Sequence, residues 1–358
     1  MKSNSLSVFV AFTVFLGVFA EQLAGQTVLV KLPDAKYEGK PLYVTDSEIA
    51  LLSRDGQIVA FHPSQAESFE KISTGFRPYS QATIRGQLLR EFGRRFDVTG
   101  TGQFLVVHPV GQRDQWAGRF EELYRSMLHY YRARGFKLRK AQFPFIAVVF
   151  PTKPEYLNYM SRHGGANPNS LGYYDVKTNR IHLYDVTAGQ SDKSRWYVNA
   201  ETIIHEAAHQ TAFNVGIHRR FANAPSWLVE GIGTLFEPRG VWDPKSNHSR
   251  ESRVNQVQLE NYQLLVNSKN SLDVLRHQLA SDRVFRQNSR LAYAHAWALT
   301  FYLTETEPRR YAKYVELTYR RKPFELYSTE ERMRDFVSIF GADLKLFDAR
   351  LQRFMESL

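Results

Sequence analysis

Residues 201–210 read ETIIHEAAHQ and contain His205, Glu206 and His209. Residues four apart on an α-helix lie one turn apart on the same face, so the two imidazoles can aim at a single point. Two nitrogen atoms that converge in this way form two corners of a tetrahedral zinc site. Glu206 lies on the flank of that face, where its carboxylate can reach a water molecule beside the metal and act as a general base.

The residues around the motif predict a buried helix over 194–214. This stretch is apolar on nearly every side, through Ile203, Ile204, Ala207, Ala208 and Ala212. Chance alone produces H-E-x-x-H in about one chain in fifty of this size. Two His and one Glu are costly in a core unless something binds them, which favours a metal site. The alternative is a pair of core histidines satisfied by hydrogen bonds.

A third zinc ligand is predicted in the segment APSWLVEGIGTLFE, residues 224–237. Pro225 and Ser226 are typical of a helix start, and Glu230 then falls one turn inside an amphipathic helix. A second helix packed against the first would bring Glu230 to the metal. The alternative is an ordinary glutamate in the first turn of a helix. Because the chain contains no Cys, any zinc must be held by His and carboxylate side chains.

H-E-x-x-H followed by W-L-x-E-G resembles the gluzincin zinc metallopeptidases, the thermolysin-like and aminopeptidase-like group. More closely, the chain resembles an uncharacterised family of exported bacterial peptidase-like proteins over residues 95–305. The resemblance implies that His205, His209 and Glu230 bind Zn²⁺ and that Glu206 is the catalytic base. It also implies a thermolysin/gluzincin-like catalytic lobe. The stretches that carry it, besides the two zinc segments, are FDVTGTGQFLVVHP, FEELYRSMLHYYRARGF, FPFIAVVF, GYYDVKTNRIHLYD and YAHAWALTFYL.

The sequence departs from the thermolysin pattern at Thr234. In thermolysin-like proteins an aspartate one turn after the glutamate ligand supports a zinc-binding histidine. A threonine cannot do the same, so we expect different residues to orient the ligands.

The transition-state donor is predicted in LAYAHAWALTFYL, which contains Tyr293 and His295. Gluzincins use a Tyr or a His from the helical lobe for this purpose, and we predict Tyr293. The two residues lie on different sides of a helix, so both cannot face the zinc. The alternative is that both only pack within an aromatic-rich helix.

The order of the predicted elements indicates an α+β protein. Strand-like runs over 26–76 predict a small β domain, and 77–95 form a linker with a helix. Residues 96–216 are expected to form an α+β catalytic lobe that contains the HExxH helix. Residues 217–358 are expected to form a helical lobe with the third zinc ligand, over the helices 226–237, 251–267, 271–280, 288–305, 308–319, 328–340 and 343–356.

The N-terminal residues 1–20 predict a secretory signal peptide. A short basic start precedes an apolar run, and Val18 and Ala20 provide the small residues of a cleavage site near Ala20. The run is too short to span a bilayer, which needs about 20 apolar residues. We therefore expect an exported protein, in the periplasm, at the cell envelope or secreted, rather than one with a membrane anchor.

The net charge of +11 comes from basic residues spread along the whole chain. Such spacing is typical of a solvated surface, and no motif indicates nucleic-acid binding. The expected partner is a peptide or protein substrate, bound along an edge strand at 179–185. Two functions have support from motifs: a zinc-dependent peptidase, or a non-catalytic or weakly active peptide- or envelope-binding protein on the same scaffold. A third, a binder of anionic polymer or nucleic acid, follows from the net charge alone.

Overall fold

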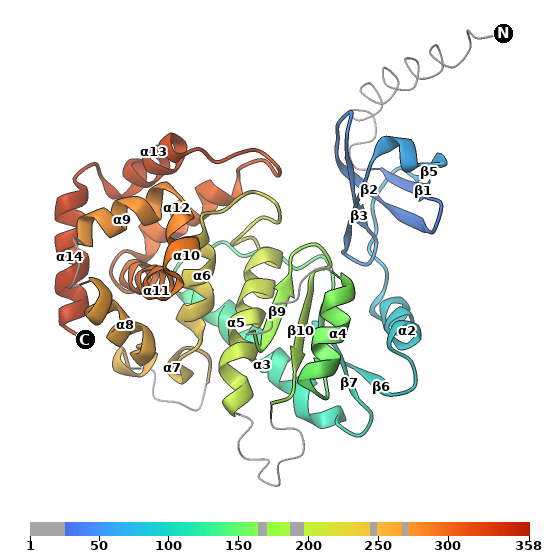
Figure 1. The fold of residues 1–358 in the computed structure, drawn as a ribbon, viewed down its shortest axis with the longest axis horizontal. Helices are drawn as coiled ribbons and strands as arrows, with labels where there is room; N and C mark the ends of the chain where they lie inside the picture. Colours follow the sequence, from blue (N-terminus) through green and yellow to red (C-terminus); the bar gives the residue numbers. More distant parts are fainter. Residues whose placement is uncertain (1–25, 164–169, 187–196, 244–248, 267–270) are drawn as a thin grey trace. The chain divides into compact units, whose positions relative to one another are not determined.

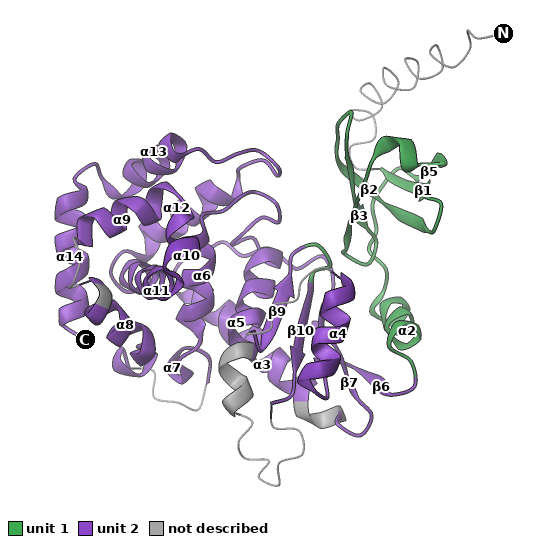
Figure 2. Cartoon of the chain, viewed as in Figure 1, with its two compact units in different colours: residues 1–93, 177–179 green, residues 94–176, 180–358 purple. Residues whose placement is uncertain are grey.

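The computed structural model describes residues 26–163, 170–186, 197–243, 249–266 and 271–358 (Figure 1). The predicted signal peptide, 1–20, lies outside the described residues. The chain divides into two compact units (Figure 2). Unit 1 comprises residues 1–93 and 177–179, and unit 2 comprises 94–176 and 180–358. The domain limits expected at 76, 95 and 216 stay predictions.

Unit 1 contains a five-stranded antiparallel sheet in the order β4-β3-β2-β1-β5. Inward-facing side chains of alternating residues, among them Val28, Val30, Ile49 and Leu51, form its own small core. The elements of this unit are β1 (Thr27–Lys31), β2 (Lys36–Val44), β3 (Ile49–Ser53), β4 (Ile58–Phe61), η1 (Pro63–Gln65), β5 (Ser68–Ser73) and α2 (Gln81–Phe92).

Unit 2 begins with a mixed five-stranded sheet in the order β6-β7-β8-β10-β9. β8 is paired in parallel with both of its neighbours, and the two outer pairs are antiparallel. Every residue of β8 is buried, as its uninterrupted apolar sequence requires in the middle of a sheet. The elements are β6 (Phe96–Gly100), β7 (Phe104–Pro109), α3 (Arg113–Ala133), β8 (Phe145–Phe150), α4 (Lys153–His163), β9 (Gly172–Asp175) and β10 (Arg180–Tyr184).

The prediction that residues 179–185 form an edge strand is wrong. β10 lies between β8 and β9 and is paired with both. Its backbone groups are therefore used within the sheet, and an extended peptide cannot be added to it. The outer position on this side of the sheet belongs to β9, the first strand of the same hairpin.

The remainder of unit 2 is helical (Figure 1). The expectation of a mixed α+β fold is thus confirmed. One predicted helix, 251–267, is interrupted, because the backbone is extended at Val254 and the side chain of Asn255 accepts a hydrogen bond from Gln258 N at a new helix start. The elements are α5 (Tyr197–Asn214), α6 (Ser226–Phe236), α7 (Arg239–Trp242), η3 (Glu251–Arg253), α8 (Gln256–Val266), α9 (Ser271–Ala280), α10 (Arg283–Gln287), α11 (Ser289–Thr306), α12 (Pro308–Tyr319), α13 (Thr329–Phe340) and α14 (Leu344–Glu356).

α6 is the central helix of unit 2, in contact with α5 and with α11. Its side chains Trp227, Leu228 and Ile232 are completely buried. Gly231 allows close contact with α11, because a side chain there would collide with Thr300. α6 and α5 are therefore held side by side by a shared core, which brings their polar residues together.

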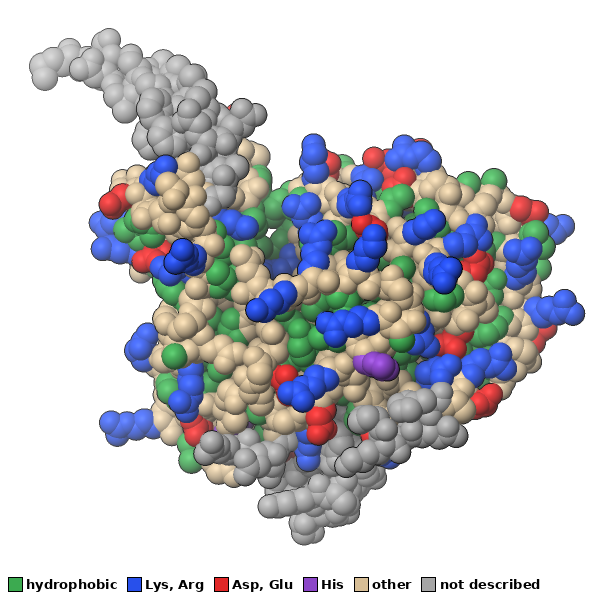
Figure 3. Space-filling view, turned by 180° about the vertical axis from the view of Figure 1, so that it is seen from behind, with side chains coloured by type: hydrophobic (Ala, Val, Ile, Leu, Met, Phe, Trp, Pro, Cys, Tyr) green, Lys and Arg blue, Asp and Glu red, His purple; other side chains and the backbone are tan. Residues whose placement is uncertain are grey.

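On the face drawn in Figure 3, blue basic side chains are spread over the surface, with a smaller number of red acidic ones among them. This agrees with the spread of basic residues along the sequence. Among the described helices, none combines the length and the apolar character needed to cross a bilayer.

Candidate metal centre

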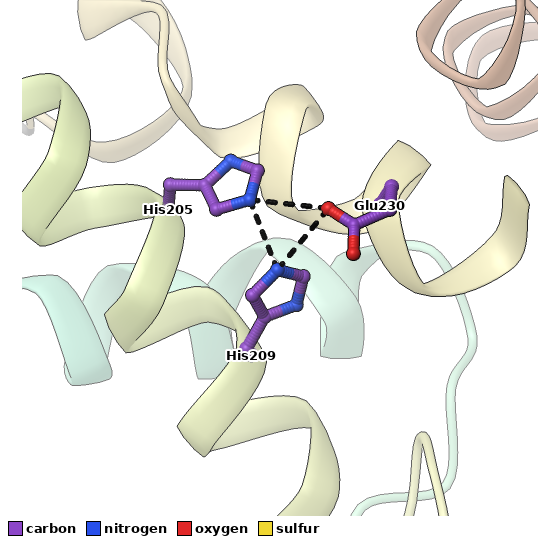
Figure 4. Close-up of side chains that lie close together, drawn as sticks. All are labelled: His205, His209 and Glu230. Atoms are coloured by element: carbon purple, nitrogen blue, oxygen red, sulfur yellow. Dashed lines mark hydrogen bonds and ion pairs between the residues drawn. The ribbon is translucent and has the colours of Figure 1, made fainter. Parts of the chain in front are cut away.

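His205 and His209 lie one turn apart on α5, and their rings converge (Figure 4). The two Nε2 atoms are 2.9 Å apart, and the ring planes are nearly perpendicular, at 87°. The apolar neighbours Ile204, Ala207 and Ala208 are buried in the core of unit 2 and fix the rotation of α5. This rotation turns both imidazoles toward α6.

Glu230 on α6 completes the group. Its Oε2 atom lies 3.3 Å from Nε2 of His205 and 3.5 Å from Nε2 of His209 (Figure 4). Zinc bonds of about 2.0–2.1 Å at tetrahedral angles put neighbouring ligand atoms about 3.3 Å apart. Among the described residues, these three form a group whose ligand atoms are close enough to share one metal ion. The donor atoms and their separations therefore fit a zinc ion.

Glu237, which the sequence interpretation missed, supports His205. Its Oε1 atom lies 2.9 Å from Nδ1 of His205, and its Oε2 accepts a hydrogen bond of 2.6 Å from the side chain of Asn255. Nδ1 of His205 donates to this carboxylate, so Nε2, which faces His209 and Glu230, is the nitrogen that can bind a metal ion. The only sequence signal was a carboxylate two turns beyond Glu230 on the same helix face.

Thr234 has no part in holding the histidines. Its hydroxyl donates hydrogen bonds to the carbonyl oxygens of Glu230 and Gly231, at 2.8 and 3.2 Å. We expected residues other than Thr234 to orient the ligands. In the structure, Glu237, directly after α6, contacts His205.

Gly233 lets His205 approach α6. A Cβ atom added at Gly233 would lie 2.6 Å from Cε1 and 2.8 Å from Nε2 of His205. Non-bonded carbon atoms do not approach so closely, since their contact distance is about 3.5–4.0 Å. The imidazole of His205 can therefore lie against α6 only because residue 233 has no side chain.

Glu206 faces the sheet. Its Oε2 atom accepts a hydrogen bond of 2.6 Å from the backbone N–H of Tyr174 on β9. Glu206 and His205 also line a cavity of about 510 Å³, together with Leu171, Glu237 and Gln258. The carboxylate is thus held between the edge strand β9 and the open space beside the histidines.

Tyr293 on α11 belongs to the same group of side chains. Its ring centroid is 6.4 Å from that of His205, and its phenol is hydrogen-bonded to Glu230. Burial and then the charge of Glu230 raise the pKa of Tyr293 well above its usual value, so the phenol keeps its proton. His295 is completely buried beside the ring of Tyr262, at 6.0 Å. The geometry therefore favours Tyr293 over His295 as a donor at this site.

The carboxylates dominate the electrostatics of the centre. Burial alone would lower the pKa of His205, but the hydrogen bonds that its ring donates to the carboxylates of Glu230 and Glu237 raise it well above its usual value. Burial would raise the pKa of Glu230, but the neighbouring histidines lower it far below its usual range. A partly buried group of this kind attracts positive charge, which a divalent cation supplies.

A family model described as "Protein of unknown function (DUF1570)" matches residues 199–325, a segment that includes His205, Glu206, His209, Glu230 and Tyr293. No curated protein matches the chain.

Solved structures similar to the chain include an M1 zinc metallopeptidase from Deinococcus radiodurans, with 15% identity and a TM-score of 0.39 over 73% of this chain and 51% of that one. A glutamate-to-alanine mutant of the same enzyme bound to the substrate Tyr-Ser-Ala matches with 14% identity and a TM-score of 0.38 over 74% of this chain and 51% of that one. The chain thus spans about half the length of these structures.

Proposed function

We propose that this chain is a zinc-dependent peptidase. The observation that carries the proposal is the convergence of His205, His209 and Glu230 on one point, together with the place of Glu206 beside His205 in the lining of one cavity. A zinc ion held by two imidazoles and one carboxylate supplies Lewis acidity for hydrolysis.

Glu206 is the proposed general base. It takes a proton from the attacking water and delivers it to the leaving amine. The backbone N–H of Tyr174 supports this role, since a hydrogen bond from a fixed strand holds the carboxylate in one position. Glu206 is next to His205 in sequence and is not one of the three converging ligand residues. Since Tyr174 donates to Oε2, the other oxygen, Oε1, is the proposed site of proton transfer.

Tyr293 is the proposed donor to the oxyanion that forms in the transition state. Its high pKa keeps the phenol protonated, so that it can donate a hydrogen bond at neutral pH. The phenol is hydrogen-bonded to Glu230, so it is located beside the proposed ligands without being one of them.

The proposed substrate is a peptide bound in extended form along β9. β9 is the outer strand of its sheet, and its residue Tyr174 directs its N–H toward Glu206. An extended peptide added to such an edge forms backbone hydrogen bonds irrespective of its side chains. Its scissile bond would then lie near Glu206 and His205, which line the same cavity.

Export is also part of the proposal. It rests on the sequence of residues 1–20, with its basic start, apolar run and small residues before position 21. The peptidase would then act on peptides in the periplasm, at the cell envelope or outside the cell.

The test begins with the metal content of the purified protein. We expect one zinc per chain in the wild type and loss of that zinc in His209→Ala, whose structural effect is monitored by thermal unfolding. Digestion of an unbiased peptide library by the zinc-loaded wild type then separates an enzyme from a binding protein. Absence of stoichiometric zinc contradicts the metal centre, and zinc without any cleavage favours the alternative of a peptide-binding protein.

A further inference from the structure

Two loops of unit 2 lie side by side and form what we call the loop pair (Figure 1). Residues 215–225 connect α5 to α6, and residues 320–328 connect α12 to α13. The rings of Phe221 and Phe324 are stacked, with their centroids 5.0 Å apart, and the backbone N–H of Phe324 donates to the carbonyl oxygen of Phe221 at 2.6 Å. From the shape, the apolar side chains and the charges of the loop pair, we propose that it binds the surface of a membrane that contains anionic phospholipids.

The backbone of the loop pair is strained. Phe221, Asn223 and Phe324 have φ angles of 65°, 48° and 68°, in the left-handed region that residues with large side chains rarely adopt. The side chain of Asn223 donates to the carbonyl oxygen of Glu325 at 2.8 Å, which adds a second contact between the loops. Strain of this kind persists where neighbouring contacts enforce it, and it is concentrated at functional sites. The loop pair therefore has a fixed shape, and binding does not have to order it first.

The loop pair carries exposed apolar side chains. Leu326 is 87% exposed, the largest fraction among the large apolar side chains of the described residues, and Phe324 is 38% exposed. The carbonyl oxygen of Leu326 accepts a hydrogen bond of 3.3 Å from Arg321, which holds the backbone from which this side chain projects. An apolar side chain that projects into water is stabilised when it enters the apolar boundary of a lipid layer. Leu326 is therefore the residue that we expect to enter the membrane.

Basic side chains accompany these apolar ones. Arg219 lies in the first loop, Arg320 and Lys322 lie in the second, and all three are exposed. A further basic segment, residues 137–140, lies beside the loop pair and contributes three more exposed basic residues, Lys137, Arg139 and Lys140. We call the loop pair together with residues 137–140 the loop surface.

Arg139 connects the segment 137–140 to both loops. Its guanidinium carbon lies 4.4 Å from the ring centroid of Tyr319, the last residue of α12 before the second loop. Its backbone N–H donates to the carbonyl oxygen of Val215, at the start of the first loop, at 2.7 Å. The three segments therefore form one continuous part of the surface of unit 2.

Positive charge exceeds negative charge among the exposed residues of the loop surface. Two of the basic residues form ion pairs, Arg320 with Glu316 at 2.6 Å and Lys322 with Glu325 at 3.2 Å. The other four have no ion pair with a described residue: Lys137, Arg139, Lys140 and Arg219. The surface of a membrane with anionic lipids attracts Lys and Arg side chains that lie within about 8–10 Å of it at ordinary ionic strength. The loop surface thus has the charge that such a membrane requires.

The exposed leucine favours a membrane over a soluble polyanion. A single-stranded nucleic acid would also be attracted by the basic residues. It offers no apolar layer to Leu326, whereas a bilayer offers anionic headgroups and an apolar boundary together. None of the proposed zinc ligands belongs to the loop surface, so the inference does not depend on the proposed peptidase activity.

A fluorescent label at position 326 tests the inference in the full chain. Because the chain contains no cysteine, Leu326→Cys can be labelled at a single position with a dye that brightens in apolar surroundings. The vesicles consist of phosphatidylcholine, with or without about one third phosphatidylglycerol. We expect brightening with the anionic vesicles, weakened by added salt, and none with the neutral vesicles.

Leu264→Cys on α8 is the matched control for the label. Leu264 is 67% exposed and lies outside the loop surface, so a dye at this position should not brighten. The comparison also separates insertion of the loop pair from any binding through the apolar N-terminal residues 8–20, which are present in both labelled chains.

Charge variants of the chain labelled at position 326 locate the binding. Titration with the anionic vesicles gives the lipid concentration at which brightening is half complete. Lys137→Gln combined with Lys140→Gln should raise this concentration about tenfold or more, because each basic residue near such a membrane contributes about fivefold. Lys345→Gln combined with Arg350→Gln, two exposed basic residues of α14, lowers the net charge equally and should leave it unchanged.

Thermal unfolding identifies variants that have lost their structure. The inference is overturned if the dye at position 326 does not brighten with anionic vesicles, or if it brightens no more than the dye at position 264. It is also overturned if the two folded double variants bind the vesicles equally. A thymidine oligonucleotide that displaces the vesicles and binds as tightly as they do would make the loop surface a polyanion site instead.

Discussion

The carboxylate of Glu237 lies 2.9 Å from Nδ1 of His205, and Asn255 donates to its other oxygen at 2.6 Å. Glu230, within α6, and Glu237, directly after α6, therefore have different roles. Glu230 faces the Nε2 atoms of the histidines, and Glu237 orients the ring of His205 from behind. Thr234 stands where thermolysin-like proteins carry a supporting aspartate, and its hydroxyl is bonded to the helix backbone. Glu237 is the carboxylate that contacts the histidine instead.

Glu237→Gln tests this contact. The amide is the same size but carries no charge, so His205 loses its charged acceptor, and we expect zinc affinity to fall about tenfold or more. The affinity is measured by competition with a chelator. Thr234→Val is the control, and it should retain zinc because the Thr234 hydroxyl is bonded to backbone carbonyl oxygens and to none of the three proposed ligand side chains. Equal losses in both variants would mean that the helix is perturbed rather than the contact removed.

Gly233→Ala should displace the ring of His205. The added methyl group would lie 2.6 Å from Cε1 of the imidazole, so the ring must move away from Glu230 or the helix must shift. We expect weaker zinc binding and lower stability. Gly118→Ala on α3 provides the comparison, since a Cβ there meets nothing within 4 Å. It should increase stability, by up to about 1 kcal/mol. Unchanged zinc affinity in Gly233→Ala would refute the steric argument.

Tyr293→Phe removes one hydroxyl group beside Glu230. If this phenol stabilises the oxyanion, kcat for a cleaved peptide should fall about 10²–10³-fold with little change in KM. Zinc content should be unaffected. The companion variant is Tyr262→Phe, a buried tyrosine beside His295, which is expected to keep its kcat. A Tyr293→Phe enzyme with normal kcat would exclude the tyrosine as the donor.

Asp282 holds the start of α6, and its ionisation makes the stability of the fold depend on pH. It accepts two hydrogen bonds from Arg332, at 2.9 and 2.8 Å, and one of 2.8 Å from the backbone of Ser226 at the start of α6. Burial alone would raise the pKa of Asp282, but Arg332 and Ser226 hold it below its ordinary value of 3.8. The stabilisation is therefore complete above about pH 4 and is lost as the pH falls through the lower pKa of the folded state.

Asp282→Asn should remove this dependence on pH. It leaves Arg332 buried with a neutral partner, and we expect a loss of about 3 kcal/mol in the free energy of unfolding at neutral pH. Urea denaturation at several pH values measures both effects. Asp273→Asn is the matched substitution, because its ion pair with Arg276 is exposed and is worth less than about 1 kcal/mol. The interpretation fails if both variants lose the same stability.

The sequence predicted those features that depend on regular spacing. The four-residue interval between His205 and His209 places both rings on one helix face in any α-helix. The apolar run of β8 required a central strand, and the long apolar stretches around α5, α6 and α11 required buried helices. The α+β fold followed from the order of these patterns.

Other features depend on contacts between distant segments. The strand order β8-β10-β9 arises from a parallel pairing of β10 with β8, which alternation of residues does not reveal, so the edge strand was assigned to the wrong half of the hairpin. Glu237 acts through the closeness of α5 to the end of α6 and through Asn255, which lies in an extended break before α8. The interval from Glu230 to Glu237 indicated a shared helix face, but nothing in the sequence indicated that Glu237 contacts His205 or Asn255.

The central claim is tested most directly by one comparison: digestion of a peptide library by zinc-loaded wild type and by zinc-loaded Glu206→Gln. The substitution removes the proposed base and leaves the three proposed ligands in place. We predict that both proteins contain one zinc and that Glu206→Gln cleaves peptides at least about 10²-fold more slowly. Equal cleavage by the two proteins, or none by the wild type, would contradict the assignment of this site to peptide hydrolysis.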